Sequence, residues 1–371
     1  MRVREIAAGE SLRRFVDLAW KINAADPHWV PPLRMSLNAT LDRRKHPFHR
    51  HAEVAYFLAE RGGEAAGRIA AIVNHRHNEF HEEKTGFFGF FESVDDPQVA
   101  DALLGAAAEW LRARGMERMR GPTSFSTNEE APLGVLVEGF DSAPFIMMAH
   151  NPPYYDRLLM DAGLRKAKDL LAYYLDDVNP HERLRRGVER IAKREGVAVR
   201  PLNMRRFKED VDIIKSIYNA AWTRNWGFVP MTDEEFDYVA KDFKPIVDPN
   251  LCLIAEVKGE PVGFSLALPD INQVLKKIPG GRLFPFGIFH FLREKRRMRG
   301  IRVITLGFRP GYQHQGLGAL LYLRGWQTGA ERGYRRGEAS WILEDNLDMR
   351  RPLENMGADP YKRFRIYEQP L

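Results

Sequence analysis

Residues 304–321 read Ile304-Thr-Leu-Gly-Phe-Arg-Pro-Gly-Tyr-Gln-His-Gln-Gly-Leu-Gly-Ala-Leu-Leu321, and this stretch decides the fold. The apolar run predicts a strand, Pro-Gly predicts a turn, and a glycine-containing loop opens a predicted helix. Gly316 and Gly318 would let an anion approach the backbone, and the unpaired N–H groups at the helix start favour a diphosphate. The structural alternative is a strand-to-helix turn that binds nothing. The spacing matches neither GxGxxG nor the Walker loop.

This spacing resembles the acyl-CoA loop of the GNAT acetyltransferase superfamily, in which Gln or Arg, two variable residues, Gly, one variable residue and Gly or Ala follow one another. Gln313, Gly316 and Gly318 match it, and Tyr312 holds the aromatic position just before the loop. The resemblance implies that acetyl-CoA or another acyl-CoA is the cosubstrate and that no metal is needed. The residues it assigns to the CoA site are Gly307, Phe308, Arg309, Gln313, His314, Gln315, Gly316, Leu317, Gly318, Ala319 and Asn346.

Two positions depart from the family pattern. His314 occupies a position that is usually Gly, and Gln315 one that is often Arg or Lys. Less positive charge therefore faces the diphosphate, which weakens CoA binding unless Arg309 or the basic run 293–302 supplies the charge.

The resemblance also implies a fold and a geometry. Strand 303–308 would splay from strand 338–343, opening a V in which the pantetheine arm pairs with backbone groups of Gly307 and Phe308. Asn346, just after the second strand, would contact the cosubstrate or cap the following helix, and both readings stay open.

An internal repeat organises the chain. Val3-Arg4-Glu5-Ile6 lies 196 positions before Val199-Arg200-Pro201-Leu202, and residues 58–67 match residues 254–263 at the same offset. Each matching stretch alternates around a Gly-containing turn, which predicts a hairpin. We therefore expect a mixed α/β protein with two GNAT-like copies, each built on a splayed mixed sheet flanked by helices.

Changing offsets place the boundaries and the insertions. The first copy covers residues 1–177, a helical linker covers 178–196, and the second copy covers 197–371. The second copy gains an insertion near 271–302, and the first gains one near 129–151.

The first copy provides a control for the second. Its equivalent of the glycine loop is Asp95-Asp-Pro-Gln-Val-Ala100, which has two carboxylates and no glycine. Asp96-Pro97 is typical of a helix start, with Asp as the cap and Pro in the first turn. We therefore expect the first copy to lack a CoA site, to brace the second and to supply a wall of the acceptor site.

Catalysis needs a base for the acceptor ammonium and often an acid for the leaving thiolate. The family often uses a Tyr as the acid, but Leu353 stands at that position and donates no proton. We expect Tyr312, Tyr361 or solvent to replace it. Glu344 is the preferred base, with Glu338 and Glu256 as weaker candidates.

An aromatic loop follows the first predicted helices of the second copy. Trp222, Trp226 and Phe228 occur where the superfamily lines its acceptor sites, and ordinary packing is the alternative, because the first copy keeps a comparable segment. Aromatic walls would suit an acceptor with a sizeable apolar or planar part.

Histidines gather in Asn74-His-Arg-His-Asn-Glu-Phe-His81. His77 and His81 have the spacing of helical zinc ligands, but Asn78 stands where a metalloprotease has Glu. We interpret the segment as a solvated loop.

Composition sets the broad class. The chain has 371 residues, 44% hydrophobic content and one cysteine, Cys252, which lies in an apolar run and is expected in a buried strand. The opening residues show no leader pattern and no apolar run reaches membrane-spanning length, so we expect a soluble, cytoplasmic protein. Within the insertion, an aromatic segment, 283–292, precedes a basic one, 293–302. This stretch would cover an acyl-chain pocket, touch an anionic membrane surface, meet a phosphate-bearing partner such as RNA, or simply pack.

Three functions follow from these observations. The first is an acyl-CoA-dependent N-acyltransferase, most simply an N-acetyltransferase, that acts on a small-molecule or peptide amine. The second is an aminoacyl-tRNA-dependent transferase, which the basic insertion suits and the intact CoA loop opposes. The third is a non-catalytic CoA-binding protein, motivated by Leu353. The acceptor, the acyl length and the oligomeric state are left open.

Overall fold

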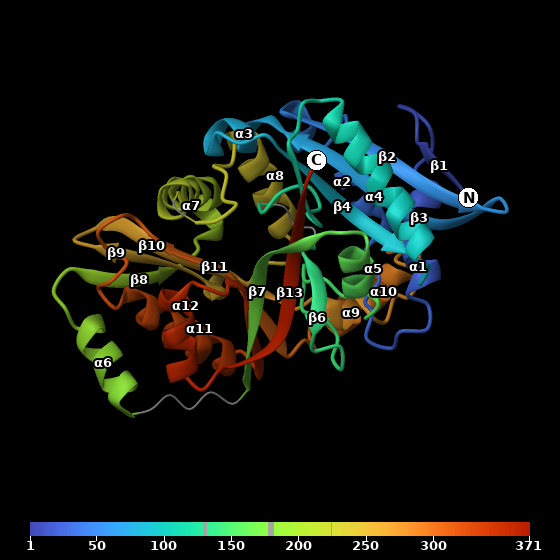
Figure 1. Ribbon diagram of the computed structural model, residues 1–371. Coiled ribbons are helices and arrows are strands. Elements are labelled where there is room, and N and C mark those ends of the chain that lie inside the picture. Colours follow the sequence, from blue (N-terminus) through green and yellow to red (C-terminus); the bar gives the residue numbers. More distant parts are fainter. Residues whose placement is uncertain (129–131, 177–181, 224) are drawn as a thin grey trace. The chain divides into compact units, whose positions relative to one another are not determined.

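The computed structural model describes residues 1–128, 132–176, 182–223 and 225–371. The chain forms two compact units (Figure 1). Unit 1 comprises Met1–Leu170, Val274–Leu292 and Lys362–Leu371, and unit 2 comprises Leu171–Gln273 and Arg293–Tyr361. Both are mixed α/β, which confirms the expected fold class. The copy boundaries at 177 and 197 stay predictions, and residues 177–181 lie outside the described part of the chain.

The sheet of unit 1 has the order β1-β2-β3-β4-β5-β13, with β6 also paired to β13. The first thirteen elements of the chain are β1 (Arg2–Glu5), α1 (Arg13–Ile22), α2 (Arg34–Leu41), the 3-10 helix η1 (Pro47–Arg50), β2 (Ala52–Arg61), β3 (Glu64–Asn74), α3 (His75–His81), β4 (Thr85–Ser93), α4 (Pro97–Arg112), β5 (Arg118–Gly121), β6 (Val135–Glu138), α5 (Tyr155–Asp161) and β7 (Arg165–Asp176).

The sheet of unit 2 has the order β7-β12-β11-β10-β9-β8. In this unit, α7 lies on one side of the sheet, and α11 and α12 lie on the other (Figure 1). The remaining elements are α6 (Glu182–Ala192), β8 (Val197–Pro201), η2 (Met204–Arg206), α7 (Phe207–Ala221), α8 (Asp233–Phe243), η3 (Pro249–Leu251), β9 (Cys252–Val257), β10 (Glu260–Pro269), α9 (Asn272–Leu275), α10 (Gly287–Lys295), β11 (Gly300–Phe308), α11 (Leu317–Glu331), β12 (Arg336–Leu343), α12 (Leu347–Asn355) and β13 (Asp359–Pro370).

Both predicted hairpins are present. β2 and β3 pair antiparallel from Arg61↔Glu64 to Ala52↔Asn74, and β9 and β10 pair from Val257↔Glu260 to Cys252↔Leu266. Cys252 is buried in β9, as expected. The alternation of apolar residues around each Gly-containing turn was sufficient to locate these strands.

The last strand of each copy belongs to the unit that is formed mainly by the other copy. Lys362–Leu371, at the end of the second copy, belongs to unit 1, where Tyr367 pairs with Gly121 of β5. Residues 171–176 of β7, at the end of the first copy, belong to unit 2, where β7 neighbours β12. The two equivalent tyrosines are fully buried accordingly, Tyr367 in the core of unit 1 and Tyr173 in the core of unit 2.

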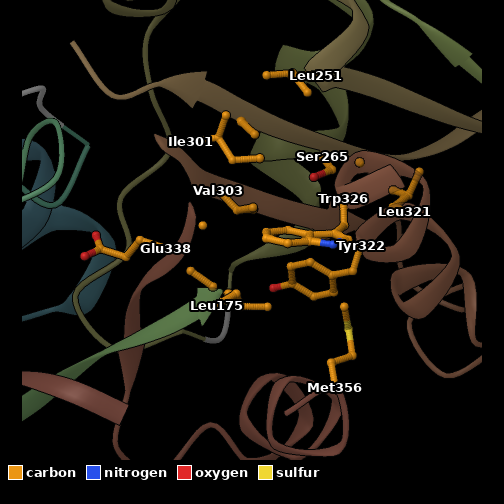
Figure 2. A pocket seen from close by; sticks show the side chains of 14 residues that line it. Leu175, Leu251, Ser265, Ile301, Val303, Leu321, Tyr322, Trp326, Glu338 and Met356 are labelled. Atoms are coloured by element: carbon orange, nitrogen blue, oxygen red, sulfur yellow. The ribbon is translucent and has the colours of Figure 1, made fainter. Parts of the chain in front are cut away.

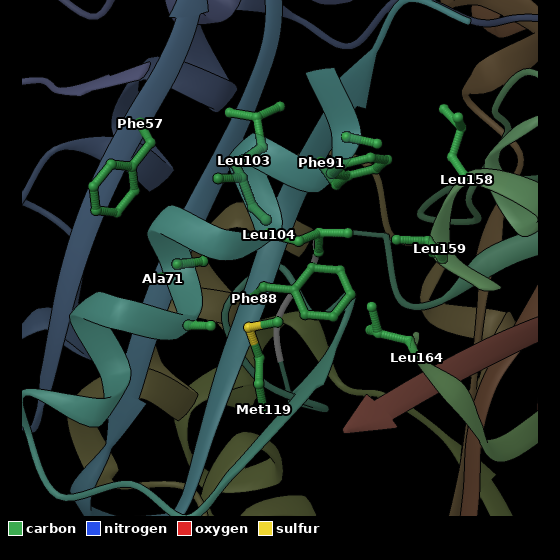
Figure 3. Close-up of a cluster of buried hydrophobic side chains, with 14 of the residues drawn as sticks. Phe57, Ala71, Phe88, Phe91, Leu103, Leu104, Met119, Leu158, Leu159 and Leu164 are labelled. Atoms are coloured by element: carbon green, nitrogen blue, oxygen red, sulfur yellow. The ribbon is translucent and has the colours of Figure 1, made fainter. Parts of the chain in front are cut away.

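Helix α4 covers one face of the sheet of unit 1. Its buried side chains Val99, Leu103 and Leu104 pack with Phe88 and Phe91 of β4 (Figure 3). This spacing presents one apolar stripe to the sheet.

The start of α4 confirms the interpretation of Asp96-Pro97. The Asp96 carboxylate accepts a hydrogen bond from the Gln98 N–H (2.9 Å), and Pro97 is the first residue of the helix. The cap therefore occupies the position that the glycine loop occupies in the second copy.

The prediction that the histidine segment is a solvated loop was wrong. Residues 75–81 form α3, because Asn74 caps the helix by accepting a hydrogen bond from the His77 N–H (3.1 Å). His77 is buried, and burial lowers its pKa to about 4. In the described ranges, no group of three or more His, Cys, Asp or Glu side chains is placed to hold a metal.

Both predicted insertions contain defined elements. The one near 271–302 contains α9 and α10, and the one near 129–151 contains β6, with residues 129–131 outside the described part. Among the described residues, no helix combines the length and the apolar character required to cross a bilayer.

Candidate functional site

Strands β11 and β12 part in the middle of the sheet of unit 2. They pair in parallel only from Gly300↔Arg336 to Val303↔Ala339, although β11 continues to Phe308 and β12 to Leu343. On its other side, β11 stays paired with β10 through Phe308↔Gly263. The described strands therefore enclose the V that the sequence predicted.

A β-bulge marks the point of divergence. Opposite β10, Val303 pairs with Ala267 and Thr305 with Leu266, which leaves Ile304 as an extra residue. A bulge bends its strand and increases the local twist, so it turns β11 away from β12 at this level.

The loop after β11 is held in shape by its own side chains. The Gly311 N–H donates to the Gln313 Oε1 (2.8 Å), and the Gln315 Nε2 donates to the Gly311 carbonyl (3.0 Å). Tyr312 is half-buried and packs against the apolar core of unit 2. His314 is exposed.

Gly316 caps α11 in the left-handed region, with φ +78°. A Cβ on Gly316 would lie 2.5 Å from the Cδ1 of Ile191, so this position excludes other residues both by conformation and by space. In the part of the chain that the structure describes, the N–H groups of residues 316–319 have no backbone acceptor. Together with the helix dipole, they form a cradle that fits a diphosphate.

The positive charge beside this cradle comes from a residue that the sequence did not single out. Helix α6 packs against α11, and the Arg194 Nη1 donates to the Gln315 carbonyl (3.1 Å). Arg309 instead donates to the Pro261 carbonyl (3.0 Å) and to Ser216 Oγ (2.9 Å). The signal in the sequence was the run of basic residues in 185–194, but nothing in it indicated which one would reach the loop.

Residues after β12 belong to the start of α12. Asn346 caps this helix, because its Oδ1 accepts a hydrogen bond from the Met349 N–H (3.3 Å). Glu344 is half-buried at the end of β12, and its carbonyl accepts from the Arg350 Nη1 (2.7 Å). Leu353 is fully buried in the core of unit 2.

The predicted acceptor residues lie in and beside an aromatic cluster. Trp222 covers Gly307 of β11 so closely that a Cβ there would lie 2.2 Å from the indole. The rings of Trp222 and Phe228 also contact Tyr218, with centroids 4.9 and 5.6 Å away. Phe228 is buried, whereas Trp226 is half-buried. Trp222 therefore packs in the aromatic cluster and also lies against β11, one of the two strands that form the V.

A buried polar network lies at the closed end of the V. Glu338 and Arg302 are opposite each other in the β11–β12 pairing, and both are almost completely buried. Ser340 Oγ and the Tyr361 hydroxyl both donate to the Glu338 carboxylate, and the Arg302 Nε lies 3.6 Å from it. The sequence named Glu338 and Tyr361 separately, and the structure brings them into contact.

Burial sets the proton affinities in this network. It lowers the pKa of Arg302 to about 10, although the Glu338 charge opposes the shift. Burial and then the Glu338 charge raise the pKa of the Tyr361 hydroxyl well above its ordinary value, so Tyr361 keeps its proton.

An apolar cavity of about 30 Å³ begins beside the last paired residues of β11 and β12 (Figure 2). Val303 and Ala339 line it together with Tyr322 and Trp326 of α11. The Glu338 carboxylate points away from these aromatic rings (Figure 2). A water-sized group needs about 10–15 Å³ by this measure, so the cavity holds only a few atoms.

Comparison with known proteins gives the family. No family model matches the chain. It is 36% identical over 377 residues to Protein YghO of Escherichia coli (strain K12), a match that covers 100% of this chain and 95% of that protein. It is 37% identical over 374 residues to the bacterial ceramide synthase of Caulobacter vibrioides, covering 97% and 95%. The chain belongs to the family of these two proteins.

Solved structures give the fold. The tandem GNAT protein from the clavulanic acid biosynthesis pathway superposes with a TM-score of 0.58 at 13% identity and covers 100% of this chain and 98% of its own. A GCN5-related N-acetyltransferase from Sphaerobacter thermophilus gives 0.54 at 14% identity, with 99% and 95% covered. These matches confirm the tandem GNAT fold.

The buried network predicts a stability effect. Replacing Glu338 with Ala removes the carboxylate that faces the buried Arg302 guanidinium, and we expect the free energy of unfolding to fall by about 3 kcal/mol. Urea denaturation measures this loss. The control Glu331→Ala, at the exposed end of α11, should change stability by less than about 0.5 kcal/mol. A Glu338→Ala variant as stable as the control would show that Glu338 has no role in holding the closed end of the V.

Proposed function

We propose that this protein is an acyl-CoA-dependent N-acyltransferase whose acceptor is the amine of a long-chain amino alcohol. The observation that carries the proposal is the glycine-opened start of α11 beside the diverging strands β11 and β12. The acceptor class is supported by 37% identity, over nearly the full length, to a protein named bacterial ceramide synthase. A ceramide is the amide formed when such an amine is acylated.

In this proposal the backbone binds most of the acyl-CoA. The free N–H groups of residues 316–319 would hold the diphosphate, with charge from Arg194. The open edge of β11 at Gly307 and Phe308 would pair with the pantetheine amides. Gln313, Gln315 and Gly311 would keep the loop in shape through the hydrogen bonds described above.

The reaction needs one proton removed and one supplied. The acceptor amine, in its neutral form, attacks the thioester carbonyl carbon. Its nitrogen loses one proton to a base as the C–S bond breaks, and the CoA thiolate takes one proton as it leaves. We propose Glu344 as this base, because it is half-buried at the open end of β12, whereas Glu338 is fully buried in the network at the closed end of the V. Tyr312, next to the loop, remains the proposed acid. Asn346 would act by fixing the start of α12.

The size of the cavity beside Val303 bears on whether the transferred acyl group is short or long. As built, its volume of about 30 Å³ accommodates an acetyl group. A long acyl chain would require Trp326 or Tyr322 to move aside. A preference for long acyl donors would therefore indicate that Trp326 moves aside when the donor binds.

Binding of acetyl-CoA tests the cradle directly by calorimetric titration. We expect the Gly318→Glu variant to lose binding, because it brings a carboxylate to the diphosphate, while a Cβ at this position makes only ordinary contacts of 3.7 Å. Arg194→Ala should weaken binding about tenfold, the value of one charge-assisted hydrogen bond.

The matched control is Lys193→Ala, which removes an exposed positive charge one residue away and should bind like the wild type. Equal losses in Arg194→Ala and Lys193→Ala would contradict a specific role for Arg194. Affinity for tRNA without affinity for CoA would instead favour the aminoacyl-tRNA-dependent alternative.

Turnover tests the reaction and the acyl length. Purified protein is incubated with a long-chain amino alcohol in detergent and with acyl-CoA donors of increasing length, and the free thiol and the amide product are measured. We expect an N-acyl product from the wild type, and we expect Trp326→Ala to shift the preference toward longer donors by at least tenfold in kcat/KM. CoA binding without amide formation across these donors would contradict this acceptor class, and the same result across a broad panel of amines would favour the non-catalytic alternative.

A further inference from the structure

The segment before and within α10 exposes an unusual amount of apolar surface. Phe284, Phe286, Phe289 and Leu292 are exposed by 64%, 76%, 68% and 60%. These four lie within nine residues of unit 1, whereas the other large exposed apolar side chains of the described chain are spread over its remaining length. Exposed apolar side chains gathered in this way indicate an interaction site.

Helical spacing places three of these side chains on one face. Phe286, Phe289 and Leu292 follow one another at intervals of three residues, so they lie along the same side of α10 and its entry. Gly287 lies on the inner side, where a Cβ would meet the Arg282 carbonyl at 2.4 Å and the Cγ2 of Ile278 at 3.2 Å.

The base of this segment is anchored to the rest of unit 1. The Trp20 Nε1 donates to the Pro279 carbonyl (2.9 Å), and the Arg34 Nε donates to the Gly280 carbonyl (2.9 Å). The Arg34 guanidinium also stacks over Trp20, 3.8 Å from the ring. The apolar side chains are therefore presented outward from a fixed base.

The charged residues that adjoin these side chains in the sequence are almost all positive. Residues 282–297 contain a single carboxylate, Glu294, which is buried and lies 3.2 Å from both Arg293 and Arg297. In the described part of the chain, Arg282 and Arg296 are exposed and form no ion pair. The remaining cation of the segment is Lys295.

We propose that the surface formed by Phe284, Phe286, Phe289 and Leu292 docks on an anionic phospholipid bilayer. Aromatic and apolar side chains flanked by Arg and Lys bind the interface between headgroups and acyl chains, where apolar burial and attraction to anionic lipid act together. Net positive charge around an apolar centre complements that surface. This proposal concerns other residues than those of the proposed acyltransferase site and goes beyond the proposed function.

Co-sedimentation of the full chain with vesicles tests the docking. We expect binding to vesicles of phosphatidylcholine and phosphatidylglycerol, weaker binding to phosphatidylcholine alone, and partial release at high salt. The Phe286→Glu/Phe289→Glu variant should lose at least tenfold in partition coefficient, and Arg282→Gln/Arg293→Gln should lose about tenfold on the anionic vesicles only.

The control is Met35→Glu/Met160→Glu, which adds the same charge at two other exposed apolar positions of unit 1 and should bind like the wild type. All variants must keep the acetyl-CoA affinity and the thermal unfolding temperature of the wild type. Equal binding of the Phe286→Glu/Phe289→Glu and control variants, or no vesicle binding by the wild type, overturns the proposal. Loss of self-association in the Phe286→Glu/Phe289→Glu variant without vesicle binding would assign the surface to a second copy of the chain. Amide formation in detergent, measured in parallel, shows whether the acyltransferase proposal holds independently of docking.

Discussion

The early end of the pairing between β11 and β12 is the constraint on which the site depends. Beyond Val303↔Ala339, the two strands no longer exchange hydrogen bonds, and the bulge at Ile304 bends β11 toward β10. Backbone groups on the open edge then need other partners, because unpaired polar groups in a buried sheet are costly. An extended acyl-CoA arm would satisfy them. The same divergence sets the positions of the glycine loop and of the start of α12.

The two copies show what is needed to keep or lose such a site. In the second copy, Gly316 adopts a positive φ, and the first N–H groups of α11 have no backbone acceptor among the described residues. In the first, the Asp96 carboxylate satisfies the equivalent helix start itself and would repel a diphosphate. The fold is preserved in both, as the cores around Tyr367 and Tyr173 show. We therefore expect the helix start to be one of the differences that separate a structural copy from one that binds an anion.

Local patterns were predictable from the sequence, and contacts between distant segments were not. The hairpins, the Asp96 cap and the glycine loop each depend on a few consecutive residues, whose turn and capping preferences are strong. The approach of Arg194 to the loop depends on how α6 packs against α11, and the Glu338–Tyr361 contact depends on where the fold places β12 and the start of β13. The histidine segment was misread because the capping role of Asn74 was overlooked in favour of the metal-like spacing. No pattern of neighbouring residues in the sequence indicated that the last strand of each copy would join the unit of the other.

Hydrogen–deuterium exchange with and without acetyl-CoA tests the central claim most directly, because it compares the two helix starts in one molecule. The account predicts slower exchange of the amides in residues 313–320 and along the open edge of β11, with no change in residues 95–100. Protection of residues 95–100, or no protection at the start of α11 under conditions where acetyl-CoA binds, would contradict the assignment of the cradle to the second copy.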